Sequence, residues 1–221
     1  PTARGPALEP SDWAAASMRI DARGRVLMPA AVDCHTHACF AGERYGEVAM
    51  RLAGTPYLDI LAAGGGIMST VRATRDADRD ALVEGIRSRL RQMRTTGTAH
   101  VEIKSGYGLR QDAEFRMLDA IEEVARHDLG LVRATFLGAH AIDGDEGEYT
   151  TAVIDGMLPA MVARYGPLPC DLYCEKGAWP RDASRRLLEK ARDLGCPLRA
   201  HVDQFSETGF LDDALALGAR T

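Results

Sequence analysis

Two histidines separated by one residue follow a short apolar stretch near the start of the chain. Residues 32–37 read Val-Asp-Cys-His-Thr-His, directly after the mainly apolar residues 26–31. Alternate side chains of an extended strand point to the same face, so His35 and His37 would project together from the strand end. Two such imidazoles can bind one metal ion with little rearrangement of the backbone. Paired histidines also occur without a metal, so the spacing alone leaves both interpretations about equally open.

Unusual polar residues also stand at the ends of four later apolar runs. These are the segment 104–108, then His140, then Glu175 with Lys176, and finally His201 followed by Gln204. The carboxyl ends of the strands of a (β/α)8 barrel build its active site. An open doubly wound sheet would instead gather its polar residues at one switch point. Five polar strand ends therefore favour the barrel.

The elements that must position these residues alternate along the chain. Apolar runs predict strands at residues 26–32, 99–103, 131–137, 170–174 and 197–202. Apolar residues at three- and four-residue spacing predict helices at 80–96, 112–127, 150–165 and 182–194. From the second strand onward the strands start roughly thirty residues apart, which is typical of βα units with a parallel sheet. We predict a (β/α)8 TIM-type barrel, of which about the first five βα units are present.

Composition excludes several classes of function. A net charge of -5 provides no basic surface for nucleic acid or an anionic membrane, and no apolar run is long enough to span a bilayer. The first residues lack the features of a signal peptide. Five irregularly spaced cysteines suit reduced thiols, so we expect a cytoplasmic protein. The chain starts without Met and stops just after an expected helix, so we expect a fragment.

The polar residues predict a hydrolytic metal site. His35, His37 and His201 would supply three nitrogen ligands, and imidazole suits both zinc and iron. A metal ion lowers the pKa of its water to near neutral and so provides a nucleophile. Arg44, seven residues after His37, could bind a carboxylate in a bidentate manner, although an ordinary surface arginine is equally open. The triple glycine at 64–66 lacks the Lys-Ser/Thr of a phosphate loop and predicts a turn needing positive φ or close backbone approach.

From about residue 20 to its end, the chain resembles the imidazolonepropionases of the amidohydrolase superfamily. The resemblance rests on the Asp-x-His-x-His strand and on blocks at 40–44, 63–67, 102–109, 135–140, 174–177 and 201–204. The Asp-x-His-x-His strand marks only the superfamily. The blocks Lys-Ser-Gly-Tyr-Gly and Phe-Leu-Gly-Ala-His, in this order, are specific to the family.

This resemblance implies metal-dependent hydrolysis of 4-imidazolone-5-propanoate to N-formimidoyl-L-glutamate, a step of histidine degradation. It implies one Zn²⁺ or Fe³⁺ per chain, with His35, His37 and His201 as ligands. Arg44 would grip the propanoate group, and Tyr107, His140 and Gln204 would contact the small-molecule substrate. His140 and Gln204 are the candidate catalytic residues. The full-length protein would be a homodimer.

The chain departs from the family pattern in ways that bear on activity. Some family members carry Glu at the position of Gln204, and Gln can hydrogen-bond but cannot transfer protons. The family's fourth metal ligand, an aspartate, and a further histidine would lie beyond Thr221, so we expect the isolated fragment to be inactive. Residues 1–25 would be the remnant of a small β-domain and linker, and residues 26–221 a partial hydrolase barrel.

Two other functions remain open. One is a different amidohydrolase, such as a deaminase or cyclic amidase, which would share the metal-binding strand. Arg44 and the pair Tyr107 and His140 argue against it, because they suit an imidazole ring that carries a carboxylate. The other is a non-catalytic remnant that binds a metal or ligand.

Overall fold

The computed structural model describes residues 21, 23–56, 59–60, 63–127 and 132–220. The chain divides into two units, residues 1–30 and residues 31–221. The described residues of the first unit form no helix or strand, and Val26 and Leu27 are exposed. The predicted strand start at residue 26 is therefore wrong: the first ladder hydrogen bond runs from Ala31 N–H to Gly97 C=O, and Pro29 has no N–H to donate. The predicted domain remnant at 1–25 falls mainly outside the described residues and stays a prediction.

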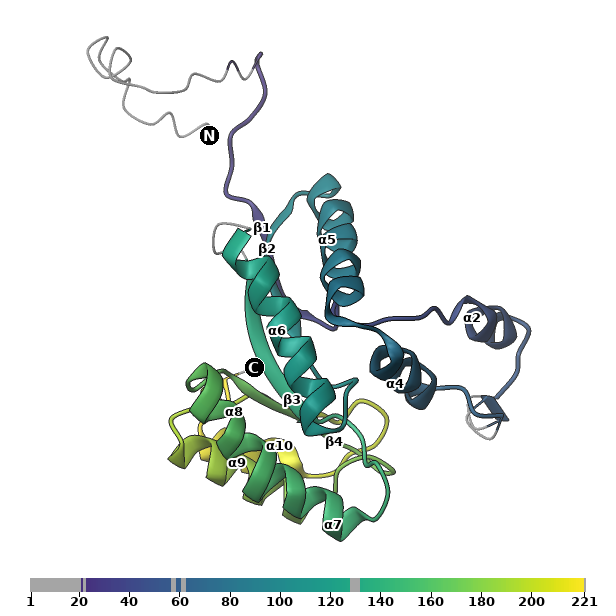
Figure 1. Ribbon diagram of the computed structural model, residues 1–221, viewed down its shortest axis with the longest axis vertical. Helices are drawn as coiled ribbons and strands as arrows, with labels where there is room; N and C mark the ends of the chain where they lie inside the picture. Colours follow the sequence, from purple (N-terminus) through teal and green to yellow (C-terminus); the bar gives the residue numbers. More distant parts are fainter. Residues whose placement is uncertain (1–20, 22, 57–58, 61–62, 128–131, 221) are drawn as a thin grey trace. The chain divides into compact units, whose positions relative to one another are not determined.

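The second unit alternates strands and helices (Figure 1). Its strands are β1 (Ala31–Thr36), β2 (Thr98–Lys104), β3 (Val132–Ala139), β4 (Cys170–Cys174) and β5 (His201–Val202). Its helices are α2 (Tyr45–Leu52), α4 (Ile67–Asp76), α5 (Arg79–Thr95), α6 (Gln111–His127), α7 (Glu146–Thr151), the π-helix η1 (Ala152–Met157), α8 (Leu158–Tyr165), α9 (Arg181–Asp193) and α10 (Phe210–Leu217). The helices predicted at 80–96, 112–127 and 182–194 are confirmed as α5, α6 and α9. The one predicted at 150–165 includes a π-helical turn.

The five strands form one parallel sheet in the sequential order β1-β2-β3-β4-β5. If this sheet were flat, four strand spacings would separate β1 from β5 by about 19 Å. The ring centroids of His35 and His201, on β1 and β5, are nevertheless only 4.4 Å apart. The sheet must therefore curl so that its first and last strands approach each other at their carboxyl ends. Sequential order and curling confirm the predicted partial (β/α)8 barrel over an open doubly wound sheet.

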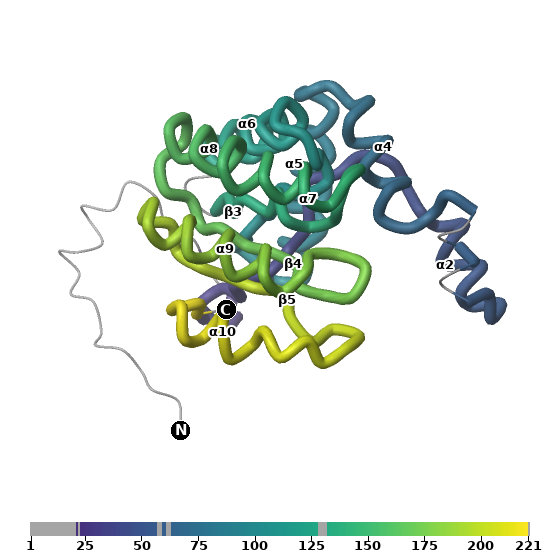
Figure 2. Tube along the Cα trace, turned by 90° about the horizontal axis from the view of Figure 1, so that it is seen from below, coloured from purple at the N-terminus to yellow at the C-terminus, as the bar shows by residue number. Residues whose placement is uncertain are grey.

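Buried stripes attach the helices to this sheet. On α6, the residues Phe115, Leu118, Ile121 and Val124 predicted to form the apolar face are all buried. Helix α5 packs on β2 and α6, α6 packs on β3, and α9 packs on β4 and α10. Figure 2 shows α5, α6 and α8 following one another around the outside of the strands. Among the described residues, no helix combines the length and the apolar character needed to cross a membrane.

Candidate functional site

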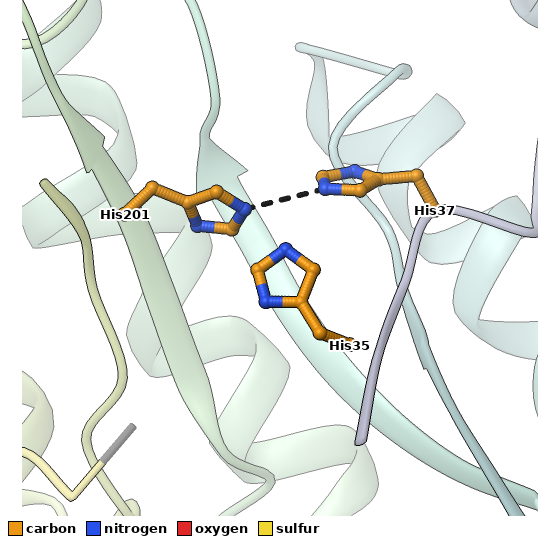
Figure 3. A group of neighbouring side chains, drawn as sticks. All are labelled: His35, His37 and His201. Atoms are coloured by element: carbon orange, nitrogen blue, oxygen red, sulfur yellow. Dashed lines mark hydrogen bonds between the residues drawn. The ribbon is translucent and has the colours of Figure 1, made fainter. Parts of the chain in front are cut away.

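Three histidines from the two outermost strands meet at the carboxyl end of the sheet. His35 is in β1, His37 follows it by two residues, and His201 begins β5. Each offers one nitrogen, and the three nitrogens lie within 4.8 Å of one another. The Nε2 atoms of His37 and His201 are 3.3 Å apart, and Figure 3 shows all three rings turned toward a common point. The predicted grouping of these residues is therefore confirmed.

The cluster has the geometry and chemistry of a metal site. Two nitrogens that bind one tetrahedral ion at about 2.0–2.1 Å lie about 3.3–3.4 Å apart, which matches the distance between the two Nε2 atoms. Burial, with the neighbouring imidazoles, lowers the pKa of His37 to about 2, so this ring is neutral near pH 7. Its buried Nδ1 has no hydrogen-bond partner among the described residues. Three converging imidazole nitrogens fit a zinc or iron ion.

A buried aspartate orients one of the three rings. Asp171 Oδ1, in β4, lies 3.1 Å from His201 Nδ1, so the Nδ1–H group donates and Nε2 is left for the cluster. Burial would raise the pKa of Asp171, but the hydrogen bond and the charges of His201 and Lys104 outweigh it and lower the pKa. The carboxylate thereby fixes both the tautomer and the direction of the His201 ring.

Lys104 connects this aspartate to a second buried carboxylate. Its Nζ lies 2.7 Å from Asp171 Oδ2 and 2.8 Å from Glu102 Oε1, and its side chain is 1% exposed. Arg199 approaches Glu102 to 3.3 Å. This charge network was not predicted from the sequence, although a signal was present: charges at alternate positions of an apolar run indicate a polar inner face. Glu102 and Lys104 are two residues apart on β2 and so share one face.

Replacing Asp171 with Asn is expected to weaken metal binding by about 10–100-fold, the usual cost of losing a ligand's carboxylate partner. The amide can still contact His201 but no longer carries the charge that stabilises the Nδ1–H tautomer. Zinc titration with a competing chelator measures the change. Asp119→Asn, which changes a surface aspartate of α6 bonded to Arg164, is the matched control. Equal zinc affinity in Asp171→Asn and the wild type would contradict this role.

His140 and Tyr107 stand beside the cluster. The His140 ring stacks on His37 at 4.9 Å between centroids, and the Tyr107 ring lies 5.1 Å from His140. His140 Nδ1 is 2.9 Å from Gly106 C=O, so Nδ1–H donates and Nε2 carries the lone pair. Burial lowers the pKa of His140 to about 4, which leaves it neutral near pH 7. Both residues are thus brought to the site as predicted, while their roles stay predictions.

Arg44 lines a pocket of about 530 Å³ together with Phe40 and Tyr107. A second, smaller hollow is lined by the same Phe40 and Tyr107 and by His37. The two hollows share these aromatic side chains, with Arg44 lining one and His37 of the histidine cluster lining the other. A cation in one hollow suits a ligand that carries a carboxylate at one end.

Glu47 positions Arg44 and the triple-glycine turn together. The Glu47 carboxylate accepts hydrogen bonds from Arg44 Nε and Nη2 at 2.9 and 2.5 Å, and from Gly66 N–H at 3.1 Å. Gly64 and Gly66 have φ values of +84° and +73°, and a Cβ on Gly65 would lie 2.7 Å from an Ile60 methyl carbon. The prediction that this turn needs positive φ or close backbone approach is confirmed.

Gln204 makes no contact with the histidine cluster in the described part of the chain. Its side chain is exposed, and no hydrogen bond or ring contact joins it to the histidines within the described part of the chain. The loop that carries it is held by Glu175, whose carboxylate accepts N–H bonds from Phe205 and Ser206 at 2.9 and 3.2 Å. A catalytic or binding role for Gln204 therefore stays a prediction.

Comparison with known proteins gives one consistent result. No family model matches the chain. It is 46% identical to an imidazolonepropionase of Herpetosiphon aurantiacus over 98% of its own length and 53% of that protein. It is 47% identical to the Chloroflexus aggregans imidazolonepropionase, over 92% of the chain and 51% of the relative. It is 45% identical to the Streptococcus sanguinis imidazolonepropionase, over 89% of the chain and 48% of the relative. The chain spans about half the length of these curated relatives.

Proposed function

Because this chain is a homologue of the imidazolonepropionases, we propose that it carries metal-binding and substrate-binding residues of an enzyme that hydrolyses 4-imidazolone-5-propanoate to N-formimidoyl-L-glutamate. The observation that carries the proposal is a pair of hollows that share Phe40 and Tyr107, one lined by Arg44 and the other by His37 of the histidine cluster. The high identity to curated imidazolonepropionases supports it. A ligand with a carboxylate at one end and a cyclic amide at the other matches this arrangement.

The metal is proposed to be one zinc or iron ion held by His35, His37 and His201. When bound, such an ion polarises a carbonyl group and activates water at neutral pH. The chain's own contribution is to aim the three imidazoles at one point. Asp171 does so for His201 through Nδ1.

His140 and Tyr107 are proposed to orient the imidazolone ring. With its proton on Nδ1, His140 presents the Nε2 lone pair and can accept a hydrogen bond or a proton from a ring N–H. Burial raises the pKa of Tyr107 above its usual value, so its hydroxyl stays protonated and can donate. Together the two rings would hold the substrate flat beside the metal cluster. Gln204 would add a hydrogen bond only if its loop moved inward.

Arg44 is proposed to bind the propanoate carboxylate, and this assignment tests the proposed function. In the full-length enzyme, Arg44→Ala is expected to raise the barrier expressed in kcat/KM by about 2–5 kcal/mol, the loss typical of a charge pair shielded from water. Arg44→Lys should restore only part of the activity, because a lysine lacks the planar fork. Ring opening of imidazolonepropanoate is the assay.

Arg51→Ala, which changes an exposed arginine in the last turn of helix α2, the helix that Arg44 precedes, is the matched control and should leave kcat/KM unchanged. If Arg44→Ala turns over imidazolonepropanoate like the wild type, the carboxylate is bound elsewhere. A full-length wild-type enzyme that binds metal but never opens the ring would contradict the proposed function itself.

A further inference from the structure

Helix α6 inserts a fully buried carboxylate beneath the loop that follows β2. Glu114 has an exposed fraction of 0%, and no ion pair joins it to a cation among the described residues. Its Oε1 accepts hydrogen bonds from Gly108 N–H at 2.7 Å and Leu109 N–H at 2.8 Å, and its Oε2 accepts one from Gly106 N–H at 2.8 Å. Three backbone donors of a single loop therefore converge on one side chain.

The loop adopts a conformation that its own residues do not favour. Leu109 has a φ of +52°, in the left-handed region that costs a non-glycine residue about 1–3 kcal/mol. Gly106 has a φ of +108°, and a Cβ there would lie 2.8 Å from Leu137 C=O and 3.1 Å from His140 Nδ1. Three N–H groups of this loop nevertheless all donate to Glu114, at distances of 2.7–2.8 Å. The Glu114 carboxylate thus supplies the interaction that offsets the unfavourable backbone.

This loop carries two contacts of the candidate site. Gly106 C=O accepts the His140 Nδ1–H bond at 2.9 Å, and the next residue, Tyr107, places its ring 5.9 Å from His37. We infer that Glu114 is a positioning residue: by fixing the 106–109 loop it holds the His140 proton on Nδ1 and presents Tyr107 to the substrate. Its effect on catalysis rests on the proposed function, whereas its effect on the His140 tautomer does not.

A role of Glu114 in stability alone would not explain why a carboxylate is buried at this position. Burying a carboxylate without a cation is costly, and an apolar residue that fills the same space would avoid that cost. Burial raises the pKa of Glu114, against the opposing effect of bonds from Ser105 and the three N–H groups. Glu114 therefore stabilises the conformation of the 106–109 loop. That conformation affects the candidate site because Gly106 and Tyr107 contact it.

The test uses Glu114→Gln in the zinc-loaded protein. The amide oxygen can still accept from Gly108 and Leu109, but its NH2 group would face Gly106 N–H, so Gly106 should turn away from His140. We expect the ¹⁵N shifts of His140 to show part of the protein with the proton on Nε2. We also expect kcat/KM to fall by about 10²-fold, as for a small misplacement of contacting groups, with zinc affinity unchanged. Glu122→Gln, on the exposed side of α6, is the matched control.

A milder variant keeps the test decisive if Glu114→Gln does not fold. Ser105→Ala removes one bond to the Glu114 carboxylate and should shift the His140 tautomer in the same direction, to a smaller extent. Unchanged His140 shifts in the folded variants would overturn the inference. A fall in kcat/KM matched by an equal loss of zinc-binding sites would also overturn it, since that indicates unfolding. If the full-length wild type opens no ring, the proposed function fails and the His140 shifts alone decide the positioning role.

Discussion

Replacing His35 and His37 together with alanine is expected to abolish metal binding. Only His201 would remain of the three nitrogens that lie within 4.8 Å of one another, and one imidazole cannot compete with water for a zinc or iron ion at micromolar concentrations. Elemental analysis of the purified protein should show about one ion per chain in the wild type and none in the double variant.

The matched control is the double variant His100→Ala and His127→Ala, which removes two exposed histidines far from the cluster in the sequence. Zinc or iron content should remain at the wild-type level in this control. Full occupancy in the His35 and His37 double variant would rule out the assignment of the metal site, and with it the chemistry proposed for the pocket.

Replacing Lys104 with methionine is expected to lower the free energy of unfolding by about 3–5 kcal/mol, the usual cost of removing one partner from a buried charge pair. Methionine fills nearly the same space, so packing is largely preserved. The carboxylates of Glu102 and Asp171 would, however, lose the ammonium group that lies 2.8 and 2.7 Å from them. Chemical denaturation of the metal-free protein measures the change.

Lys190→Met, on the outer helix α9, is the control and should change the unfolding free energy by less than about 0.5 kcal/mol. A second measurement, of zinc affinity, distinguishes loss of this charge network from a general loss of packing in the core. Zinc affinity should fall in Lys104→Met, because Asp171 would no longer be held toward His201. A variant as stable as the wild type would mean that water or Arg199 compensates for the missing lysine.

Local patterns in the sequence predicted most of the elements but not their exact limits. The buried stripe of α6 follows from three- and four-residue spacing, which needs no knowledge of the rest of the fold. The start of β1 depends instead on a partner: the ladder begins where Ala31 meets Gly97. The exposed Val26 and Leu27 are as apolar as the strand itself, so composition could not exclude them.

In the candidate site, too, some features could be predicted from the sequence and others could not. The His-x-His spacing and Arg44 could be recognised from the sequence, because their chemistry is carried by residue type and by nearby positions. The bond between Asp171 and His201 joins residues 30 positions apart on neighbouring strands, so it depends on register. Glu114 could not be identified, since on a helix it looks like any acidic residue of a first turn. The role of Gln204 rests on its position in a motif alone, and it stays a prediction.

The meeting of His37 with His201 also has a consequence for folding. The two residues are 164 positions apart, so an ion bound by both would act as a reversible cross-link between the first and last strands. Closing a loop of this length in an unfolded chain costs on the order of 5 kcal/mol of conformational entropy. In the folded chain this entropy has already been lost on folding, because the curled sheet holds the two histidines together before an ion binds. The folded chain should therefore bind zinc far more tightly than the same histidines in the denatured chain. Metal uptake during refolding would therefore mark the moment at which the two edges of the sheet come together.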